Sequence, residues 1–323
     1  MKRRAFITLI GGAAAWPVAA RAQQSVMPVI GLLSELTPEA EVNRVAAFKT
    51  GLREIGYIDG TNVSIEYQWA NGQKERLPSL ASDFVQRGVS VIATGGVPAT
   101  AAAKAATSRI PIVFNVGFDP VFSGLVSSLN RPGGNLTGVA RLEAETEAKR
   151  LEILRELVPG AKAIGYLLNP TNPDGGTRMA QDAAHAMGIE LIPVPVSSAS
   201  ELEAAFTNWT KLGVGALLIQ GETLFFSQHK WIAAQALQLA IPAVFTLREF
   251  AKAGGLASLG ADRLDAYRLS GAYVGRILKG ETAENLPVQQ ATKVELTINL
   301  KTAKALGLTV PPTLLARADE VIE

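Results

Sequence analysis

Apolar residues occur in short, nearly continuous runs from Met27 onward, and amphipathic stretches separate these runs. A run such as 89–94 (VSVIAT), preceded by glycine, is typical of a strand buried on both faces of a sheet. The predicted strands are 29–34, 63–69, 89–94, 112–116, 163–168, 190–196, 216–220, 243–246 and 256–259. The predicted helices lie near 39–55, 75–87, 98–107, 145–157, 175–187, 200–211, 228–239 and 262–279. Alternating strands and helices indicate βαβ units and parallel sheets.

The two halves of the chain repeat the same order of turn residues. Gly-Tyr at 56–57, Gly-Val at 88–89 and Ile-Pro at 110–111 have counterparts at 188–189, 213–214 and 241–242, at offsets of 132, 125 and 131 residues. We therefore expect an α/β protein of two Rossmann-like lobes with parallel sheets, joined by more than one hinge crossing. The expected division is residues 27–139 plus 258–290 for lobe 1, and 140–257 plus 291–323 for lobe 2.

The first residues are typical of an export signal. A basic stretch at 2–4 (KRR) precedes an uncharged, largely apolar core at 5–15, and Ala-Arg-Ala at 20–22 forms a cleavage site. This core is about a dozen residues long, whereas a membrane-spanning helix needs ~20. Residues 3–7 (RRAFI) also fit a twin-arginine signal, with an ordinary Sec signal as the alternative. We expect residues 1–22 to be removed and the mature protein to lie free in the periplasm.

Charge and composition exclude several classes of function. Residues 1–22 carry four of the 31 basic residues and no acidic one, so the mature chain has 27 basic against 29 acidic residues. This near balance gives no reason to expect a nucleic-acid partner. The chain has no cysteine, which excludes disulfides, thiolate catalysis and cysteine metal sites.

Catalytic motifs are also missing from the sequence. No G-x-S-x-G, H-E-x-x-H, Walker A or G-x-G-x-x-G motif is present. The two histidines, His185 and His229, each lie in a predicted helix, where a surface or packing role is expected. We expect no enzyme activity, no cofactor and no metal.

Hydrogen-bonding residues end most of the predicted strands. In open α/β sheets, ligands bind at the carboxyl ends of the strands. Segment 94–99 (TGGVPA) combines glycines that admit close backbone approach with a helix N-terminus that favours an anion, although an ordinary strand-to-helix turn is the alternative. The expected ligand-binding residues are Ser34, Thr94, Gly95, Gly96, Pro98, Ala99, Asn115, Asp119, Asn169, Thr171, Gln220, Glu222 and Thr246. This pattern predicts a small ligand that carries a carboxylate, with Asp119 or Glu222 facing an ammonium group if there is one.

Several longer segments resemble a known family. They are 51–57 (GLREIGY) with 62–67 (NVSIEY), 94–99, 119–120 (DP), 129–138 (LNRPGGNLTG), 254–258 (GGLAS) and 300–312 (LKTAKALGLTVPP). The chain from 27 to 323 is similar to ABC-transporter substrate-binding proteins related to those for tryptophan and other aromatic amino acids. The resemblance implies a type I periplasmic-binding fold, a small-molecule ligand held between the lobes, and an ABC permease of the inner membrane as partner.

Two other functions are compatible with the same fold. A periplasmic sensor subunit would present the closed form to a membrane receptor instead of a permease. A two-lobed isomerase would need an acid and a base across the cleft, and Asp119 and Glu222 are the pair that the sequence offers. The leading prediction is a monomer that closes around its ligand.

The cleavage site generates a first testable prediction. Protein recovered from the periplasm should begin at Gln23, because the small residues Ala20 and Ala22 precede that position. Intact-mass measurement checks the new N-terminus. Recovery of a chain that starts at Met1 in the membrane fraction would contradict it.

Overall fold

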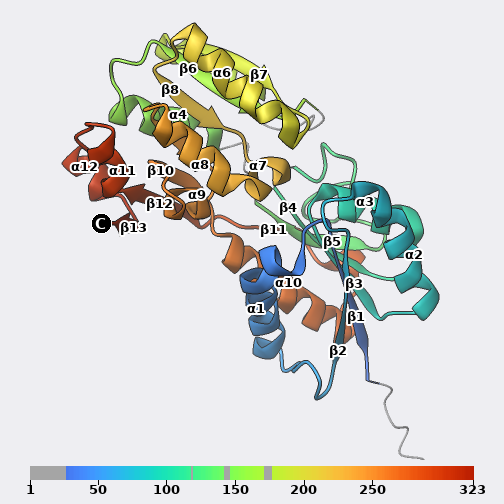
Figure 1. Ribbon diagram of the computed structural model, residues 1–323. Coiled ribbons are helices and arrows are strands. Elements are labelled where there is room, and N and C mark those ends of the chain that lie inside the picture. Colours follow the sequence, from blue (N-terminus) through green and yellow to red (C-terminus); the bar gives the residue numbers. More distant parts are fainter. Residues whose placement is uncertain (1–26, 118, 142–145, 171–176) are drawn as a thin grey trace, which may run out of the picture.

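The computed structural model describes residues 27–117, 119–141, 146–170 and 177–323. One of its two sheets is built mainly from residues 29–140 (Figure 1). Its strand order is β11-β5-β4-β3-β1-β2, and every pairing is parallel. The bounds are β1 Val29–Ser34, β2 Ser64–Trp69, β3 Val91–Gly95, β4 Ile112–Val116, β5 Leu136–Ala140 and β11 Gln289–Gln290.

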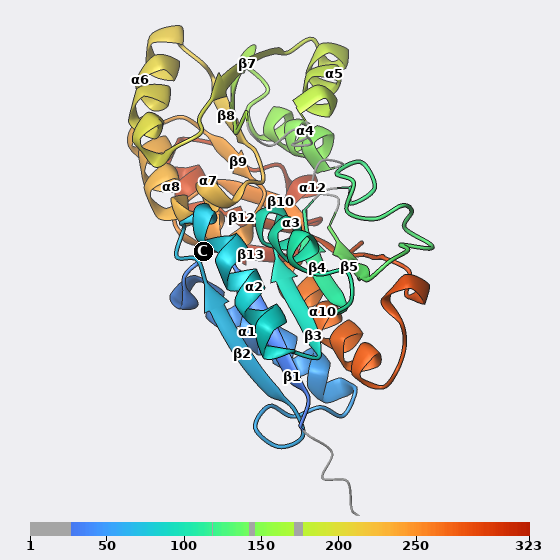
Figure 2. The same cartoon turned by 90° about the vertical axis from the view of Figure 1, so that its right-hand side faces the viewer.

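The second sheet has the strand order β13-β12-β10-β9-β8-β6-β7. Its pairings are parallel except for the antiparallel pair of β10 and β12. The bounds are β6 Ala163–Leu168, β7 Glu190–Pro195, β8 Ala216–Ile219, β9 Ala243–Phe245, β10 Ala257–Ala261, β12 Val294–Asn299 and β13 Glu320–Ile322. Each sheet forms the centre of one lobe (Figure 2).

Both lobes have the same topology, as the repeated turn residues predict. The order β2-β1-β3-β4-β5 in the first sheet corresponds to β7-β6-β8-β9-β10 in the second. The matched turns also agree, because Gly88 and Gly213 both end a helix in the left-handed conformation, with φ of 65° and 64°. Gly31 and Gly165 occupy equivalent strand positions, and each leaves space for an aromatic ring of the covering helix.

Helices cover the faces of both sheets (Figures 1 and 2). Their bounds are α1 Pro38–Glu54, α2 Leu77–Arg87, α3 Val97–Ala106, α4 Glu147–Leu157, α5 Thr177–Met187, α6 Leu202–Leu212, α7 Thr223–Ser227, α8 His229–Gln238, α9 Arg248–Lys252, α10 Arg263–Leu278, α11 Leu300–Ala305 and α12 Pro312–Leu315. The sequence pattern did not predict α7 and α9, because five residues are too few to show a helical period. Within the described residues, no helix is both long and apolar enough to cross a membrane.

The chain passes between the two sheets three times: after β5, between β10 and α10, and between β11 and β12. The second crossing lies later than the sequence indicated. Residues 258–261 were expected in lobe 1, but they belong to β10, which pairs with β12 and β9 of the second sheet. The alternation of short apolar runs identifies a strand but does not show which sheet it joins.

Helices α1 and α10 lie side by side on one face of the first sheet, although more than 200 residues separate them in sequence (Figure 1). Glycines make this close approach possible. A Cβ atom on Gly51 would overlap the carbonyl oxygen of Arg268, and a Cβ atom on Gly271 would overlap that of Phe48. Gly275, one turn further along α10, leaves space for the Ile55 side chain. The returning helix is therefore held against the N-terminal helix at backbone contact distance.

Replacing one of these glycines tests the contact. Gly271→Ala should lower the free energy of unfolding by about 1–3 kcal/mol, because the two helices must separate to admit the methyl group. Chemical denaturation of purified protein measures the change. Gly160→Ala is the matched control, since a Cβ atom there meets nothing within 4 Å, and it should stay within about 0.5 kcal/mol of wild type. Equal stability of the two variants would contradict the assignment.

Candidate ligand-binding site

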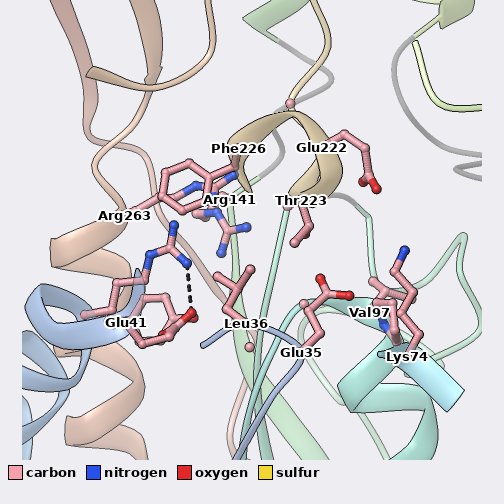
Figure 3. Close-up of a pocket in the computed structure, with 17 residues that line it drawn as sticks. Glu35, Leu36, Glu41, Lys74, Val97, Arg141, Glu222, Thr223, Phe226 and Arg263 are labelled. Atoms are coloured by element: carbon pink, nitrogen blue, oxygen red, sulfur yellow. Dashed lines mark hydrogen bonds and ion pairs between the residues drawn. The ribbon is translucent and has the colours of Figure 1, made fainter. Parts of the chain in front are cut away.

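A cavity of about 60 Å³ lies between the two lobes (Figure 3). The first lobe contributes Glu35, Leu36, Glu41, Arg44, Lys74, Gly95, Gly96, Val97, Pro98, Gly117, Arg263 and Tyr267. The second lobe contributes Gly221, Glu222, Thr223 and Phe226, and Arg141 comes from the first crossing. The lining contains basic and acidic side chains together, so the cavity suits a ligand that carries charge.

Strand ends and two helices position these residues. Glu35, Gly96 and Gly117 follow β1, β3 and β4 within one residue, and Gly221 follows β8 by two. These carboxyl ends are where open α/β sheets bind ligands. Helix α1 adds Glu41 and Arg44, one turn apart, and the adjacent α10 adds Arg263 and Tyr267, also one turn apart. The packing of α1 against α10 therefore brings two basic residues, an acidic residue and a tyrosine to one wall.

Glu41 and Arg44 form a buried ion pair in this wall. Arg44 Nη1 donates to Glu41 Oε1 at 2.8 Å, and the two residues are 5% and 1% exposed. Burial acts to lower the pKa of Arg44, but the charge of Glu41, followed by Tyr267 and Glu249, more than reverses this and raises it. Phe226 of the second lobe lies across this pair, with its ring centroid 4.4 Å from the Arg44 guanidinium carbon. A desolvated cation over a ring face stabilises the closed arrangement by about 2 kcal/mol.

Glu35 is the second buried acidic residue of the cavity and is 3% exposed. Burial raises the pKa of its carboxyl group above the ordinary value, and the charges of Glu222 and Glu41 act in the same direction. A hydrogen bond with Thr223 and the charge of Lys74 act against this shift. Glu35 and Thr223 belong to different lobes and point toward one another (Figure 3). The two side chains therefore face each other across the cleft.

Three polar atoms of this wall have no hydrogen-bond partner among the described residues. They are Oε2 of Glu35, Oε2 of Glu41 and Nη2 of Arg44, all buried. Buried polar groups in native structures are almost always satisfied, so such atoms around a cavity indicate groups that a ligand satisfies. The set contains one cationic donor and two carboxylate acceptors.

Arg141 is oriented by a chain of hydrogen bonds within the first lobe. Its Nη1 donates to Asn115 Oδ1, and Asn115 Nδ2 donates to Ser270 Oγ at 3.1 Å. Ser270 Oγ in turn donates to the carbonyl oxygen of Ala266 at 2.9 Å. The Arg141 amide also donates to the carbonyl oxygen of Val116 in β4 at 2.9 Å, so both the backbone and the side chain of Arg141 are held beside the cavity.

The turn between β3 and α3 lines the cavity with backbone. Gly96 has a φ of 87°, which favours glycine, and it begins α3 without a side-chain cap. A Cβ atom on Gly95 would lie 2.5 Å from the Tyr267 hydroxyl, so glycine also allows α10 to approach. The N-terminus of this ten-residue helix faces the cavity and favours a negative group.

Four of the predicted site residues line the cavity: Gly95, Gly96, Pro98 and Glu222. Thr171 lies outside the described residues. The other eight do not line this cavity; they are Ser34, Thr94, Ala99, Asn115, Asp119, Asn169, Gln220 and Thr246.

The hydroxyl groups among these eight serve the loops. Ser34 Oγ accepts from the Leu36 amide at 3.1 Å and donates to Glu41, which fixes the turn after β1. Thr94 Oγ1 bonds to Thr100 Oγ1 at 2.8 Å, and Thr100 in turn donates to the Gly96 carbonyl. Thr246 Oγ1 donates to the Ile219 carbonyl at 3.4 Å and lies beside a separate, smaller hollow near the second crossing. Their geometry supports positioning rather than direct contact.

The other predicted residues have different structural roles. Ala99 is fully buried in the first lobe. Asp119 Oδ1 accepts from the amide of Val121 at 2.8 Å and closes a turn. Asn169 orients Glu222, because its side-chain Nδ2 donates to Glu222 Oε1 at 3.0 Å. The backbone amide of Asn169 donates to Gln220 Oε1.

Most of the charged lining was missed from the sequence. Glu35 directly follows Ser34, the last residue of the predicted strand 29–34, and this position is the sequence feature that points to it. Glu41, Arg44, Arg263 and Tyr267 lie on helices, and which helix face meets the cleft depends on the packing of α1 against α10. Among the described residues, no group of three His, Asp or Glu side chains could hold a metal ion.

With this geometry, a family comparison becomes informative. The family model described as ABC transporter substrate binding protein matches residues 30–322. The chain belongs to this family. It is 28% identical over 279 residues to a tyrosine-binding protein of Clostridioides difficile (strain R20291), covering 85% of this chain and 80% of that protein.

Solved structures of two substrate-binding proteins show the same architecture. The ABC domain of Streptococcus pneumoniae in complex with L-Trp is 25% identical, with a TM-score of 0.85, over 91% of this chain and 99% of that one. A ligand-free, open substrate binding protein with adhesive properties from Clostridium difficile has the same identity and coverage but a TM-score of 0.68. The predicted type I periplasmic-binding fold is confirmed. By TM-score, this chain superposes better on the L-Trp complex than on the open, ligand-free structure.

The buried carboxyl group of Glu35 generates a pH-dependent prediction. Because its pKa in the folded protein is above the ordinary 4.5, the folded protein holds a proton that the unfolded chain releases. The stability from Glu35 is therefore present at low pH and lost as pH rises past 4.5 and through the folded-state pKa. Glu35→Gln, neutral at every pH, should gain stability relative to wild type as pH rises from below 4.5 through the folded-state pKa of Glu35. Thermal unfolding across this range measures the difference.

Glu39→Gln is the control for this series. Hydrogen bonds from its own backbone amide, and then from Thr37, lower the pKa of Glu39, so this variant should lose stability relative to wild type as pH rises. A difference between Glu35→Gln and wild type that does not change with pH would contradict the assignment of Glu35.

Proposed function

We propose that this protein is the periplasmic substrate-binding subunit of an ABC importer and that it binds an α-amino acid between its lobes. The lobes close on the amino acid, and the closed form delivers it to a permease of the inner membrane. The protein acts as a monomer and without chemistry on the ligand. Family membership supports the transport role, and the site supports the ligand class.

The observation that carries the ligand class is the set of unsatisfied, oppositely charged atoms in one cavity. Arg44 Nη2 and the N-terminus of α3 favour the carboxylate of the ligand. Oε2 of Glu35 and Oε2 of Glu41 are acceptors for the ammonium group. A zwitterion offers a charged partner to both kinds of unsatisfied atom at once, whereas a neutral sugar offers them uncharged hydrogen bonds only.

The side chain of the ligand is proposed to be aromatic or branched. The relatives named above are a tyrosine-binding protein and a domain in complex with L-Trp. The cavity offers apolar surface from Leu36, Val97 and Phe226 beside its charged groups. Because it measures only about 60 Å³ in this closed arrangement, the lobes must move apart to admit such a side chain.

The isomerase alternative has little support from the site. It would need Asp119 and Glu222 as an acid and base pair. Asp119 is engaged in a turn and does not line the cavity. A sensor subunit would use the same site and the same closure, so the ligand class applies to it equally.

Calorimetry with modified amino acids tests the zwitterion. L-Tyrosine, L-tryptophan and L-leucine should be titrated beside the corresponding amides, which lack the carboxylate, and the N-acetyl forms, which lack the ammonium. Either change should weaken binding by about 10- to 100-fold, because each removes a charge-assisted hydrogen bond of about 1.5–3 kcal/mol.

The control is a second readout of the same compounds. Thermal shift at 100 times the dissociation constant should show about 2.7 kcal/mol of stabilisation for the free amino acid. The proposal fails if a neutral sugar is the tight ligand, or if amides and N-acetyl forms bind as well as the free amino acid.

A further inference from the structure

Leu36 belongs to the first lobe by sequence but is buried in the second. It lies in the turn between β1 and α1, both of which pack in the first lobe. Its side chain is 8% exposed and is part of an apolar cluster of the second lobe that includes Leu167, Phe225 and Phe226. Leu36 therefore bridges the cleft through apolar contact.

The turn that carries Leu36 is fixed at both ends. The Leu36 amide donates to Ser34 Oγ at 3.1 Å, and the Gly72 amide donates to the carbonyl oxygen of Glu35 at 2.7 Å. Thr37 then caps α1 by accepting from the Ala40 amide. Because this backbone is held within the first lobe, Leu36 moves with that lobe as a rigid projection.

Two further contacts cross the cleft beside Leu36. The Glu35 side chain faces Thr223 of the second lobe (Figure 3). The Phe226 ring lies 4.4 Å from the Arg44 guanidinium carbon and 5.7 Å from that of Arg263. When the lobes separate, the Leu36 side chain and the face of Phe226 both lose their cover. The exposed apolar surface opposes separation, so part of the drive for closure is present before a ligand arrives.

We infer that Leu36 is a closure residue, which sets the balance between the open and closed forms and thereby the affinity for every ligand of the site. This inference rests on the proposed function only in that closure accompanies binding. For a ligand that requires the closed form, the apparent affinity falls in proportion to the population of that form. Truncation of Leu36 should then lower the affinity for different ligands by the same factor.

The absence of cysteine makes the test direct. Ser82→Cys in α2 and Asn208→Cys in α6 place two spin labels on exposed positions, one on each lobe, in a chain with no other thiol. Pulsed electron paramagnetic resonance on the ligand-free protein should show a shorter distance for wild type and a shift toward the longer, open distance for Leu36→Ala. Leu36→Met, which keeps the apolar bulk, should retain the wild-type distance distribution.

Leu77→Ala is the matched control, since Leu77 is a buried leucine of the first lobe with no part in the second. It should lower thermal stability and leave the distance distribution unchanged. In calorimetry, Leu36→Ala should lower the affinity for L-tyrosine and for L-leucine by the same factor, up to about tenfold.

An unchanged ligand-free distance distribution in Leu36→Ala would overturn the inference. Unequal weakening of L-tyrosine and L-leucine would also overturn it, because Leu36 would then act as a ligand contact. The distance measurement needs no ligand, so failure of amino acid binding and failure of the closure role are separate results.

Discussion

The backbone contact between α1 and α10 is the constraint on which the site depends. Gly51 and Gly271 each face a carbonyl oxygen of the other helix, and a methyl group at either position would overlap it. This contact fixes the N-terminal helix against a helix that returns from the second lobe. The charged residues Glu41 and Arg44 are thereby set beside Arg263 and Tyr267, and the second crossing is anchored at the cavity. A looser helix pair would leave these side chains without a defined geometry.

Closure of the lobes buries charge, and this has a cost that other contacts must offset. Removing an ion from water costs several kcal/mol even after relaxation, and a buried pair recovers this only with good geometry. Arg44 keeps Glu41 at 2.8 Å and gains the ring of Phe226, but its Nη2 is unsatisfied in the protein alone. Apolar burial of Leu36 favours closure, and the buried charges oppose it; in the proposed function, a zwitterionic ligand satisfies these charges. The two effects together make closure sensitive to the ligand.

The fold was predictable because local signals agreed with each other. Buried strands gave continuous apolar runs, and left-handed glycines such as Gly88 and Gly213 marked equivalent turns of both lobes. The site was only partly predictable. The rule that ligands bind at strand ends found Gly95, Gly96 and Glu222, because that geometry follows from parallel pairing. Arg44 and Arg263 depend on how two distant helices pack, and no local pattern carries that information. The sequence predicted the Thr94 hydroxyl as a ligand contact, but this hydroxyl forms a hydrogen bond with Thr100 of α3.

The two lobes contribute unequally to the cavity, and this gives binding an order. Among the described residues, the first lobe supplies the ion pair, Glu35, the α3 N-terminus and Tyr267, whereas the second supplies the short segment from Gly221 to Phe226. In the proposed function, an amino acid that meets the open protein therefore finds most of its charged partners on the first lobe. The later arrival of Glu222, Thr223 and Phe226 covers it and removes water, which strengthens each ionic contact already made. Association is then governed by the charge pattern of one lobe, and residence time by the contacts that hold the second lobe in place.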